Sequence, residues 1–261
     1  MLRRLFAVAP LCIAALSVQA CSVDLTQDSP GDAGRLRFRY AGEDCLLGCP
    51  VDREVLAGAA MDVTVSNLDP DVRYSARTTT SSIATATSRQ SCDCATHIAG
   101  ETRSRPVQPE DKCAAGEEKS CTLFVTLETK GAGDVKLEVL DGARVYVDSM
   151  TAKVREPARL VSTVRSDNQE VARGADGVYS IKLDAAVQIE TKVFSASDQD
   201  LLFTGHGVDV KFADERVIGP LDFEIFGSSD TAVGKAKALG DARVTIRAGT
   251  RTEALAFRVV R

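Results

Sequence analysis

The most reactive side chains in this sequence are cysteines, and most of them are clustered. The chain has eight cysteines, and six of these lie between Asp44 and Thr122. An even number of cysteines is typical of disulfides in a protein that leaves the cytoplasm, and the N-terminus described below predicts export. We therefore expect disulfides among Cys45, Cys49, Cys92, Cys94, Cys113 and Cys121.

The pairing of these cysteines is open, but their neighbourhoods favour one bond. We favour Cys113 with Cys121, and we expect Cys92 and Cys94 to bond elsewhere rather than to each other. Residues 81–120 are rich in Ser, Thr, Pro and charge and alternate little in hydropathy, so we predict an insertion without regular structure. Each crosslink would stabilise it by about 2–4 kcal/mol.

A metal or redox site is the alternative use of the same thiols. Cys92, Cys94 and His97 place two thiols and an imidazole within six residues, and Cys45 and Cys49 could complete the ligand set. The spacings C-x-C and C-x₃-C are not those of structural zinc sites, and an oxidising compartment favours disulfides. We predict no metal and no cofactor; a thiol-based metal or redox sensor remains an alternative.

Histidine chemistry is restricted because the chain has only two histidines, His97 and His206. The motifs G-x-S-x-G and H-E-x-x-H are absent. His206 lies between Gly205 and Gly207, which indicates a bend. We predict that the protein is not an enzyme. An envelope hydrolase that uses His206 or a carboxylate pair is the alternative.

Acidic residues recur two positions apart in two predicted turns, Asp69/Asp71 and Asp198/Asp200. Such oxygens can bind calcium, but the spacing of an EF-hand loop is missing, so we expect solvated turn acids. The whole chain is acidic, with 32 Lys and Arg against 37 Asp and Glu. Because DNA and RNA binding requires clustered basic residues, we expect no nucleic-acid partner.

The N-terminus has the order of a secretory signal. Arg3 and Arg4 precede an apolar stretch over residues 5–16, followed by small and polar residues. The segment Val18-Gln19-Ala20-Cys21 resembles the lipobox of bacterial lipoproteins, although glutamine departs from its commonest form. The resemblance implies a signal peptide over residues 1–20, a lipid-modified Cys21 and a membrane anchor. In Gram-negative members of that family, an Asp directly after the lipidated Cys retains the protein on the inner membrane, so Ser22 favours the outer membrane. Residues 21–34 have the composition of a flexible tether.

Beyond the tether, apolar and polar residues alternate with a period of two, as in Met61/Val63/Val65 and Leu255/Phe257/Val259. This pattern predicts strands with one buried face and an all-β fold. Only residues 231–239 resemble a helix, and Gly234 weakens that assignment. We place a boundary near Glu156-Pro157, which divides the chain into domains over residues 35–156 and 157–261.

The two halves end alike. Residues 133–154 and 240–259 each contain Gly-Asp, an alternating strand, a turn and a second strand. These closing hairpins resemble the last strands of bacterial immunoglobulin-like (Ig-like) domains, which implies two Ig-like β-sandwiches in tandem. Such sandwiches present loops from a rigid scaffold, so we expect a structural or adhesion-like binding module of the cell envelope, with a protein or glycan partner at the cell surface.

Overall fold

The computed structural model describes residues 28–41, 49–98, 101–204, 207–221 and 231–261, and within these ranges every regular element is a strand. The all-β fold class is therefore confirmed. None of the described segments is a helix that is long and apolar enough to cross a membrane.

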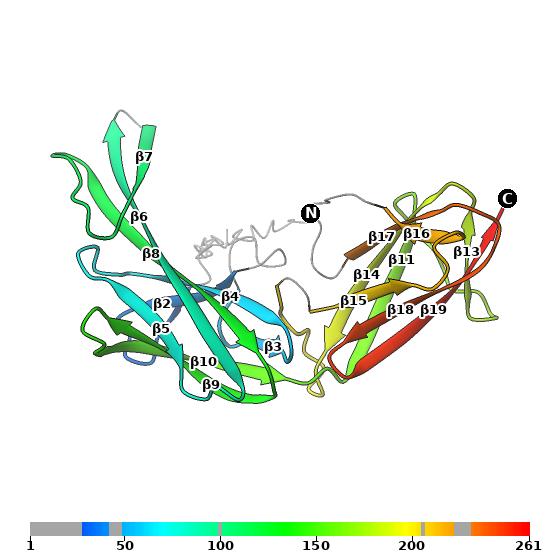
Figure 1. The fold of residues 1–261 in the computed structure, drawn as a ribbon, viewed down its shortest axis with the longest axis horizontal. Helices are drawn as coiled ribbons and strands as arrows, with labels where there is room; N and C mark the ends of the chain where they lie inside the picture. The colour runs from blue at the N-terminus through cyan, green and yellow to red at the C-terminus, as the bar shows by residue number, and fades with distance from the viewer. Residues whose placement is uncertain (1–27, 42–48, 99–100, 205–206, 222–230) are drawn as a thin grey trace, which may run out of the picture.

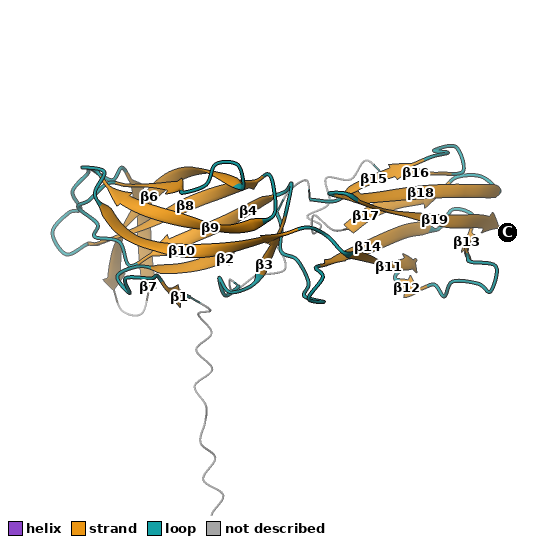
Figure 2. Cartoon of the chain, turned by 90° about the horizontal axis from the view of Figure 1, so that it is seen from below, coloured by secondary structure: helices purple, strands orange, loops and turns teal. Residues whose placement is uncertain are grey.

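The first ten described strands form two sheets packed face to face (Figures 1 and 2). One sheet has the order β1-β2-β4-β8-β6-β7, and the other has the order β3-β10-β9-β5. The strands are β1 (Ser29–Pro30), β2 (Arg37–Ala41), β3 (Glu54–Leu56), β4 (Ala60–Ser66), β5 (Tyr74–Thr78), β6 (Ala84–Ile98), β7 (Glu101–Val107), β8 (Glu118–Thr129), β9 (Gly133–Asp141) and β10 (Tyr146–Arg155).

The remaining described strands form a second pair of sheets further along the molecule (Figure 1). Their orders are β12-β11-β14-β17-β16 and β13-β19-β18-β15. The strands are β11 (Arg159–Ser166), β12 (Gln169–Glu170), β13 (Val178–Lys182), β14 (Ala186–Phe194), β15 (Asp209–Phe212), β16 (Ile218–Pro220), β17 (Thr231–Ala236), β18 (Gly240–Ala248) and β19 (Arg251–Val260).

Both sheet pairs have the strand order of the immunoglobulin fold. The orders β2-β4-β8-β6 and β11-β14-β17-β16 correspond to strands A-B-E-D, and β10-β9-β5 and β19-β18-β15 correspond to G-F-C. In each pair a short strand, β3 or β13, runs parallel to the last strand, β10 or β19. The fold is therefore two Ig-like β-sandwiches in tandem. The sheets change between Arg155 and Arg159, near the predicted boundary; separate folding of the two halves stays a prediction.

The two cores are made by the alternating apolar residues that the sequence indicates. Met61, Val63 and Val65 are buried in the first core, where Phe38 and Tyr40 are the largest fully buried side chains. Burial of such side chains stabilises the fold by about 1.5–3 kcal/mol each.

The predicted weak helix over residues 231–239 is instead strand β17, which pairs with β14 and β16. A Cβ atom on Gly234 would lie 2.9 Å from the ring of Phe212, so glycine is required by close packing here. Leu221, Phe223 and Ile225 also alternate with polar residues in the sequence, but Phe223 and Ile225 lie outside the described residues.

The two sandwiches share a buried junction. The loop between β14 and β15 reaches back to the first sandwich, where Leu202 is buried in the first core. Its backbone N–H donates to the carbonyl of Glu54, and its carbonyl accepts from Leu56, both at 2.9 Å. Beside it, Leu201 packs against Leu56, Val193 and other apolar residues. The second sandwich thus completes the core of the first.

The N-terminal segment is fixed by one buried carboxylate. Asp148, at the start of β10, is fully buried and accepts backbone N–H bonds of 2.7–2.8 Å from Ala33, Arg35, Leu36 and Ser149. Burial alone would raise the pKa of Asp148, but these N–H donors outweigh it and hold the pKa below its usual range. The described chain therefore begins firmly attached to the first sandwich, and the predicted flexible tether over residues 21–34 is wrong for residues 28–34.

Candidate functional site

The main departure from a plain Ig-like sandwich is a long hairpin arm on the first sandwich. Strands β6 and β8, of 15 and 12 residues, pair from Ala84↔Thr129 to Ala95↔Glu118. Beyond Cys92, β6 also pairs with β7, and this part projects from the body of the molecule (Figure 1). We call residues 90–121 the stapled arm.

The prediction of an irregular insertion over residues 81–120 was wrong for most of its length, because residues 84–98 and 101–107 are strands. Hydropathy alternates little in the arm because most of its described side chains are partly or fully exposed, and its buried positions are the cysteines Cys92, Cys94 and Cys121. Backbone pairing and β-branched threonines still favour an extended chain there.

Two disulfides fasten the arm. Cys92 bonds Cys121 with their Cα atoms 4.1 Å apart, and Cys94 bonds Cys113 with their Cα atoms 5.6 Å apart. The favoured Cys113–Cys121 bond was wrong, because the register of β6 and β8 places Cys92 opposite Cys121. Cys92 and Cys94 do not bond each other, as expected.

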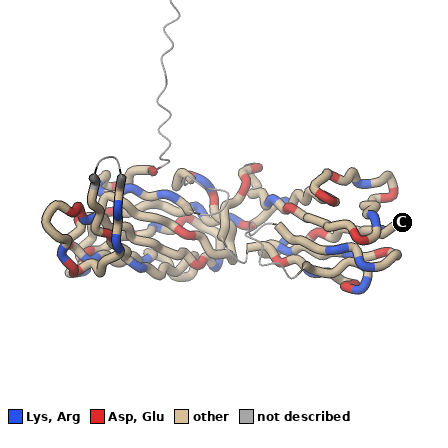
Figure 3. Tube along the Cα trace, turned by 90° about the horizontal axis from the view of Figure 1, so that it is seen from above, with Lys and Arg blue, Asp and Glu red and all other residues tan. Residues whose placement is uncertain are grey.

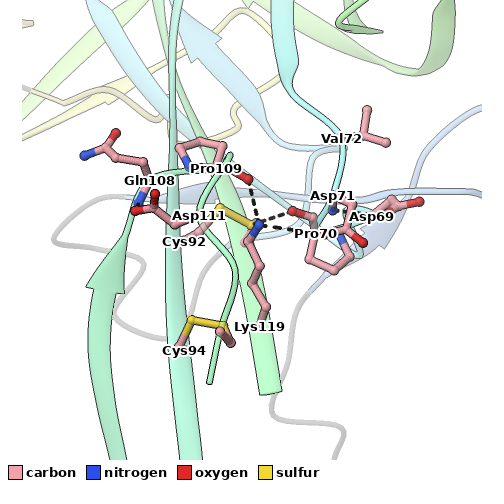
Figure 4. A network of polar contacts seen from close by, with 12 residues as sticks. Asp69, Pro70, Asp71, Val72, Cys92, Cys94, Gln108, Pro109, Asp111 and Lys119 are labelled. Carbon is pink, nitrogen blue, oxygen red and sulfur yellow. Dashed lines mark hydrogen bonds and ion pairs between the residues drawn. A yellow bond between two sulfur atoms is a disulfide. The ribbon is translucent and has the colours of Figure 1, made fainter. Parts of the chain in front are cut away.

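Lys119 is the polar centre of the arm (Figure 4). Its side chain is only 10% exposed, its Nζ donates a 2.6 Å hydrogen bond to the carbonyl of Pro109, and the same Nζ lies 3.8 Å from a carboxylate oxygen of Asp71. Next to it, the Sγ atom of Cys121 lies 3.8 Å from the carbonyl oxygen of Pro70. One lysine therefore joins β8 to two loops, and no sequence pattern marks it.

The base of the arm is closed against strand β5. Gln90 accepts the backbone N–H of Tyr74 at 2.8 Å and donates to the carbonyl of Val72 at 3.0 Å. Ser88 accepts the N–H of Ala76 at 3.1 Å. Side chains of β6 thus take the place of a neighbouring strand along β5, and they hold the arm at a fixed angle to the sandwich.

Ion pairs neutralise the outer part of the arm. Arg105 binds Glu117 through two nitrogens at 3.2 and 2.8 Å, and Arg73 binds Glu110 at 2.6 Å. Hydrogen bonds from these arginines lower the pKa of Glu117 and of Glu110, and the bond to Glu117 raises the pKa of Arg105. These carboxylates stay ionised and bound, so they are unsuited to proton transfer at neutral pH.

Strand β7 is the edge of its sheet, and its described side chains from Thr102 to Pro106 are exposed. Proline lacks a backbone N–H, so Pro106 weakens this edge as a template for another strand. The arm therefore offers side chains rather than a continuous backbone ladder to a partner.

The described residues do not form the thiol-based metal or redox site that the sequence left open. Among the described residues, Cys94, Cys113 and Glu117 form the one cluster with metal-ligand spacing, but the two sulfurs are bonded to each other and Glu117 is bound by Arg105. Cys49 is also disulfide-bonded. Cys45 lies outside the described residues.

The structure describes neither histidine side chain. His97 belongs to β6, with its side chain outside the description, and His206 lies outside the described residues, as does Cys21. The acidic turns are engaged within the fold: Asp198 contacts the guanidinium of Arg159, and the carbonyl of Asp200 accepts from Arg53.

Comparison with known proteins adds no family. No protein-family model and no curated protein matches the chain. Solved structures with similar architecture include domains 5–6 of the S-layer protein SbsC, at 13% identity and a TM-score of 0.31, covering 80% of this chain and 92% of that one. FdeC, an Escherichia coli adhesin, has 14% identity and a TM-score of 0.29, covering 90% and 66%.

A third structure, BspA_C_WT, has 11% identity and a TM-score of 0.34, covering 85% of this chain and 99% of that one. The matches thus include bacterial surface-layer and adhesin proteins. Their identities and TM-scores are too low to assign a function to this chain.

Proposed function

We propose that the chain is a non-catalytic lipoprotein of the cell envelope, anchored at Cys21 in the outer membrane, that presents the stapled arm to a partner at the cell surface. The anchor is supported by the lipobox-like segment Val18–Cys21. The binding role is supported by the arm itself.

The observation that carries this proposal is the rigidity of the arm. Two disulfides, the Lys119 contacts and the Arg105–Glu117 pair fix a hairpin whose outer part is exposed and whose base packs into the first core. Fixing a projecting surface before contact reduces the entropy lost on binding. A structure of this kind is costly to maintain unless the projecting surface is used.

The two alternatives require features that the described residues do not supply. A thiol-based sensor needs free Cys92 and Cys94, which are both in disulfides. A hydrolase needs His206 or two neighbouring carboxylates in a cleft. In the arm, Glu110 and Glu117 are each bound by an arginine instead. Substitution of His206 with Ala should leave the fold and the surface role unchanged.

The anchor is tested by the intact mass of the protein from membranes, alkylated without reduction. We expect a mass that begins at Cys21 with added acyl chains and no alkylated thiol among the six clustered cysteines. The Cys21→Ser variant should lack the lipid mass and leave the membrane fraction. An unlipidated wild-type chain would refute the anchor, and alkylated Cys92 or Cys94 would restore the thiol alternative.

The role of the arm is tested by site-specific photo-crosslinking in intact cells. A photoreactive residue at Ser104, exposed on β7, should give a discrete adduct, whereas the same residue at exposed Lys182 on β13 should not. Equal labelling at both positions, or none at Ser104, would contradict presentation by the arm.

A further inference from the structure

A second surface of the first sandwich has the chemistry of a binding site. On the outer face of the sheet β2-β4-β8-β6, Phe124 projects outward and is 41% exposed, although its neighbours Leu123 and Val125 are buried. Beside it lies an open hollow of about 450 Å³ lined by Asp62, Thr64, Thr87, Ser88, Arg89, Phe124 and Thr126, among others.

The strand register places a row of complementary groups across this face. Arg39, Thr64, Phe124 and Arg89 are direct neighbours from β2 to β6. The guanidinium of Arg89 lies 5.6 Å from the ring centroid of Phe124, within cation–π range. The row therefore combines an apolar ring, a hydroxyl and two cations.

The next row supplies hydrogen-bonding oxygens. Thr126 donates to the carboxylate of Asp62 at 2.7 Å, and Thr87 follows on β6. On the other side of the Phe124 row, Ser66 and Thr122 continue the hydroxyl surface. A ligand that lies over Phe124 would thus meet hydroxyl groups on both sides and the carboxylate of Asp62 on one side.

Arg89 is the cation available to a ligand. Across the described ranges, it has no carboxylate within ion-pair distance, and its contact is with the Phe124 ring. Arg39, by contrast, lies 3.7 Å from Asp28 and donates to Thr64. Arg89 therefore contributes a positive charge that has no carboxylate partner among the described residues and that lies over the ring of Phe124.

We propose that this face binds a polysaccharide that carries carboxylates. The apolar face of a sugar ring would stack on Phe124, its hydroxyls would bond Asp62 and Thr126, and its carboxylate would pair with Arg89. This inference goes beyond the proposed role of the arm, from which it is separate in position and chemistry.

A peptide is a poorer occupant. The site lies in the middle of a sheet, where the backbone groups of β4 and β8 are already paired on both sides, so no strand can be added there. The face is also dominated by hydroxyl groups, with Phe124 as its one aromatic ring among the described residues. A sugar chain needs no free strand edge to bind, and its rings can stack on one aromatic ring while their hydroxyls bond the surrounding polar groups.

The test uses the chain purified from the membrane fraction and isothermal titration with polygalacturonic acid, with neutral dextran as the uncharged probe. We expect binding to polygalacturonic acid at low salt and at least tenfold weaker binding to dextran. Phe124→Ala and Arg89→Gln should each weaken binding about tenfold or more, as loss of a principal contact does.

The matched control is Arg159→Gln. Arg159 lies over the ring of Phe194 on the second sandwich, but its guanidinium is already bound by Asp198. The Arg159→Gln variant should bind polygalacturonic acid as tightly as the wild type does. Equal affinity for the two polymers, or equal losses in Arg89→Gln and Arg159→Gln, would overturn the proposal. Loss in Arg89→Gln without loss in Phe124→Ala would show plain charge attraction and would overturn it too. The anchor at Cys21 is tested separately by mass, so the two results are independent.

Discussion

Replacing Asp148 with Asn tests the attachment of the N-terminal segment most directly. Each carboxylate oxygen accepts two backbone N–H bonds: Oδ1 from Ala33 and Ser149, and Oδ2 from Arg35 and Leu36. In asparagine one of these oxygens becomes an NH₂ donor, which must face two N–H donors. Two of the four hydrogen bonds are lost whichever way the amide turns.

The expected cost follows from those two bonds. Hydrogen bonds to a charged acceptor contribute about 1.5–3 kcal/mol each, and buried donors left unpaired retain their desolvation penalty. We therefore expect Asp148→Asn to lower the free energy of unfolding by about 3–5 kcal/mol. With an m-value of about 2 kcal/mol per molar urea, the unfolding midpoint should fall by about 2 M.

The assay is urea unfolding followed by circular dichroism at pH 7, with Asp214→Asn as the control. Asp214 is a carboxylate at the surface, bound by its neighbour Arg216, and its loss should leave the midpoint nearly unchanged. A midpoint for Asp148→Asn within about 0.5 M of the wild type would refute the argument that the buried carboxylate fixes the segment.

The pH dependence provides a second check on the same residue. Because the pKa of Asp148 is lowered in the folded state, its stabilisation is fully present above the unfolded pKa of about 3.9. It is lost as the pH falls from there through the folded pKa. The difference between wild type and Asp148→Asn should therefore shrink in acid, and a constant difference would contradict the ionised state.

Three further predictions concern the junction and the arm. Leu202→Ala should lower the unfolding free energy of the first sandwich by about 2–4 kcal/mol, seen as a separate early transition in calorimetry. Expressed alone, residues 157–261 should fold, whereas residues 28–156 should be less stable than the first sandwich in the intact chain because they lack Leu202. If residues 28–156 alone were as stable as the first sandwich in the intact chain, the shared core would be contradicted. The double variant Cys94→Ser/Cys113→Ser should speed tryptic cleavage after Lys112 at least tenfold without unfolding the second sandwich, and unchanged cleavage would show that the disulfide does not fix the arm.

The sequence predicts the sandwiches well because a strand with one buried face has apolar residues at every second position. Met61, Val63 and Val65 are buried at alternate positions, as their spacing indicates. The same argument fails in the arm, where most of the described side chains between the cysteines are partly or fully exposed. Residues 84–98 are a strand fixed by pairing with β8 and by disulfides, neither of which appears in local hydropathy.

The candidate site was predictable only in part, for a related reason. The cysteines marked the region, but Cys92 meets Cys121 through a strand register that depends on the whole sheet. The alternation of Leu123 and Val125 places Phe124 on the opposite face of its strand, but no local pattern shows that Arg89 lies beside it. Lys119 and Asp148 depend on partners up to 115 residues away, which a local pattern cannot encode.

The fixing contacts lie at separate places along the described part of the chain. Asp148 attaches the start of the described chain, Leu202 joins the sandwiches, and two disulfides hold the arm. An enzyme needs its rigidity around a pocket where reacting groups meet. Here the fixing contacts run from the N-terminal segment to the arm, and Figure 3 shows basic and acidic residues interspersed along both sandwiches. Such a distribution suits a protein that holds a fixed surface toward a partner.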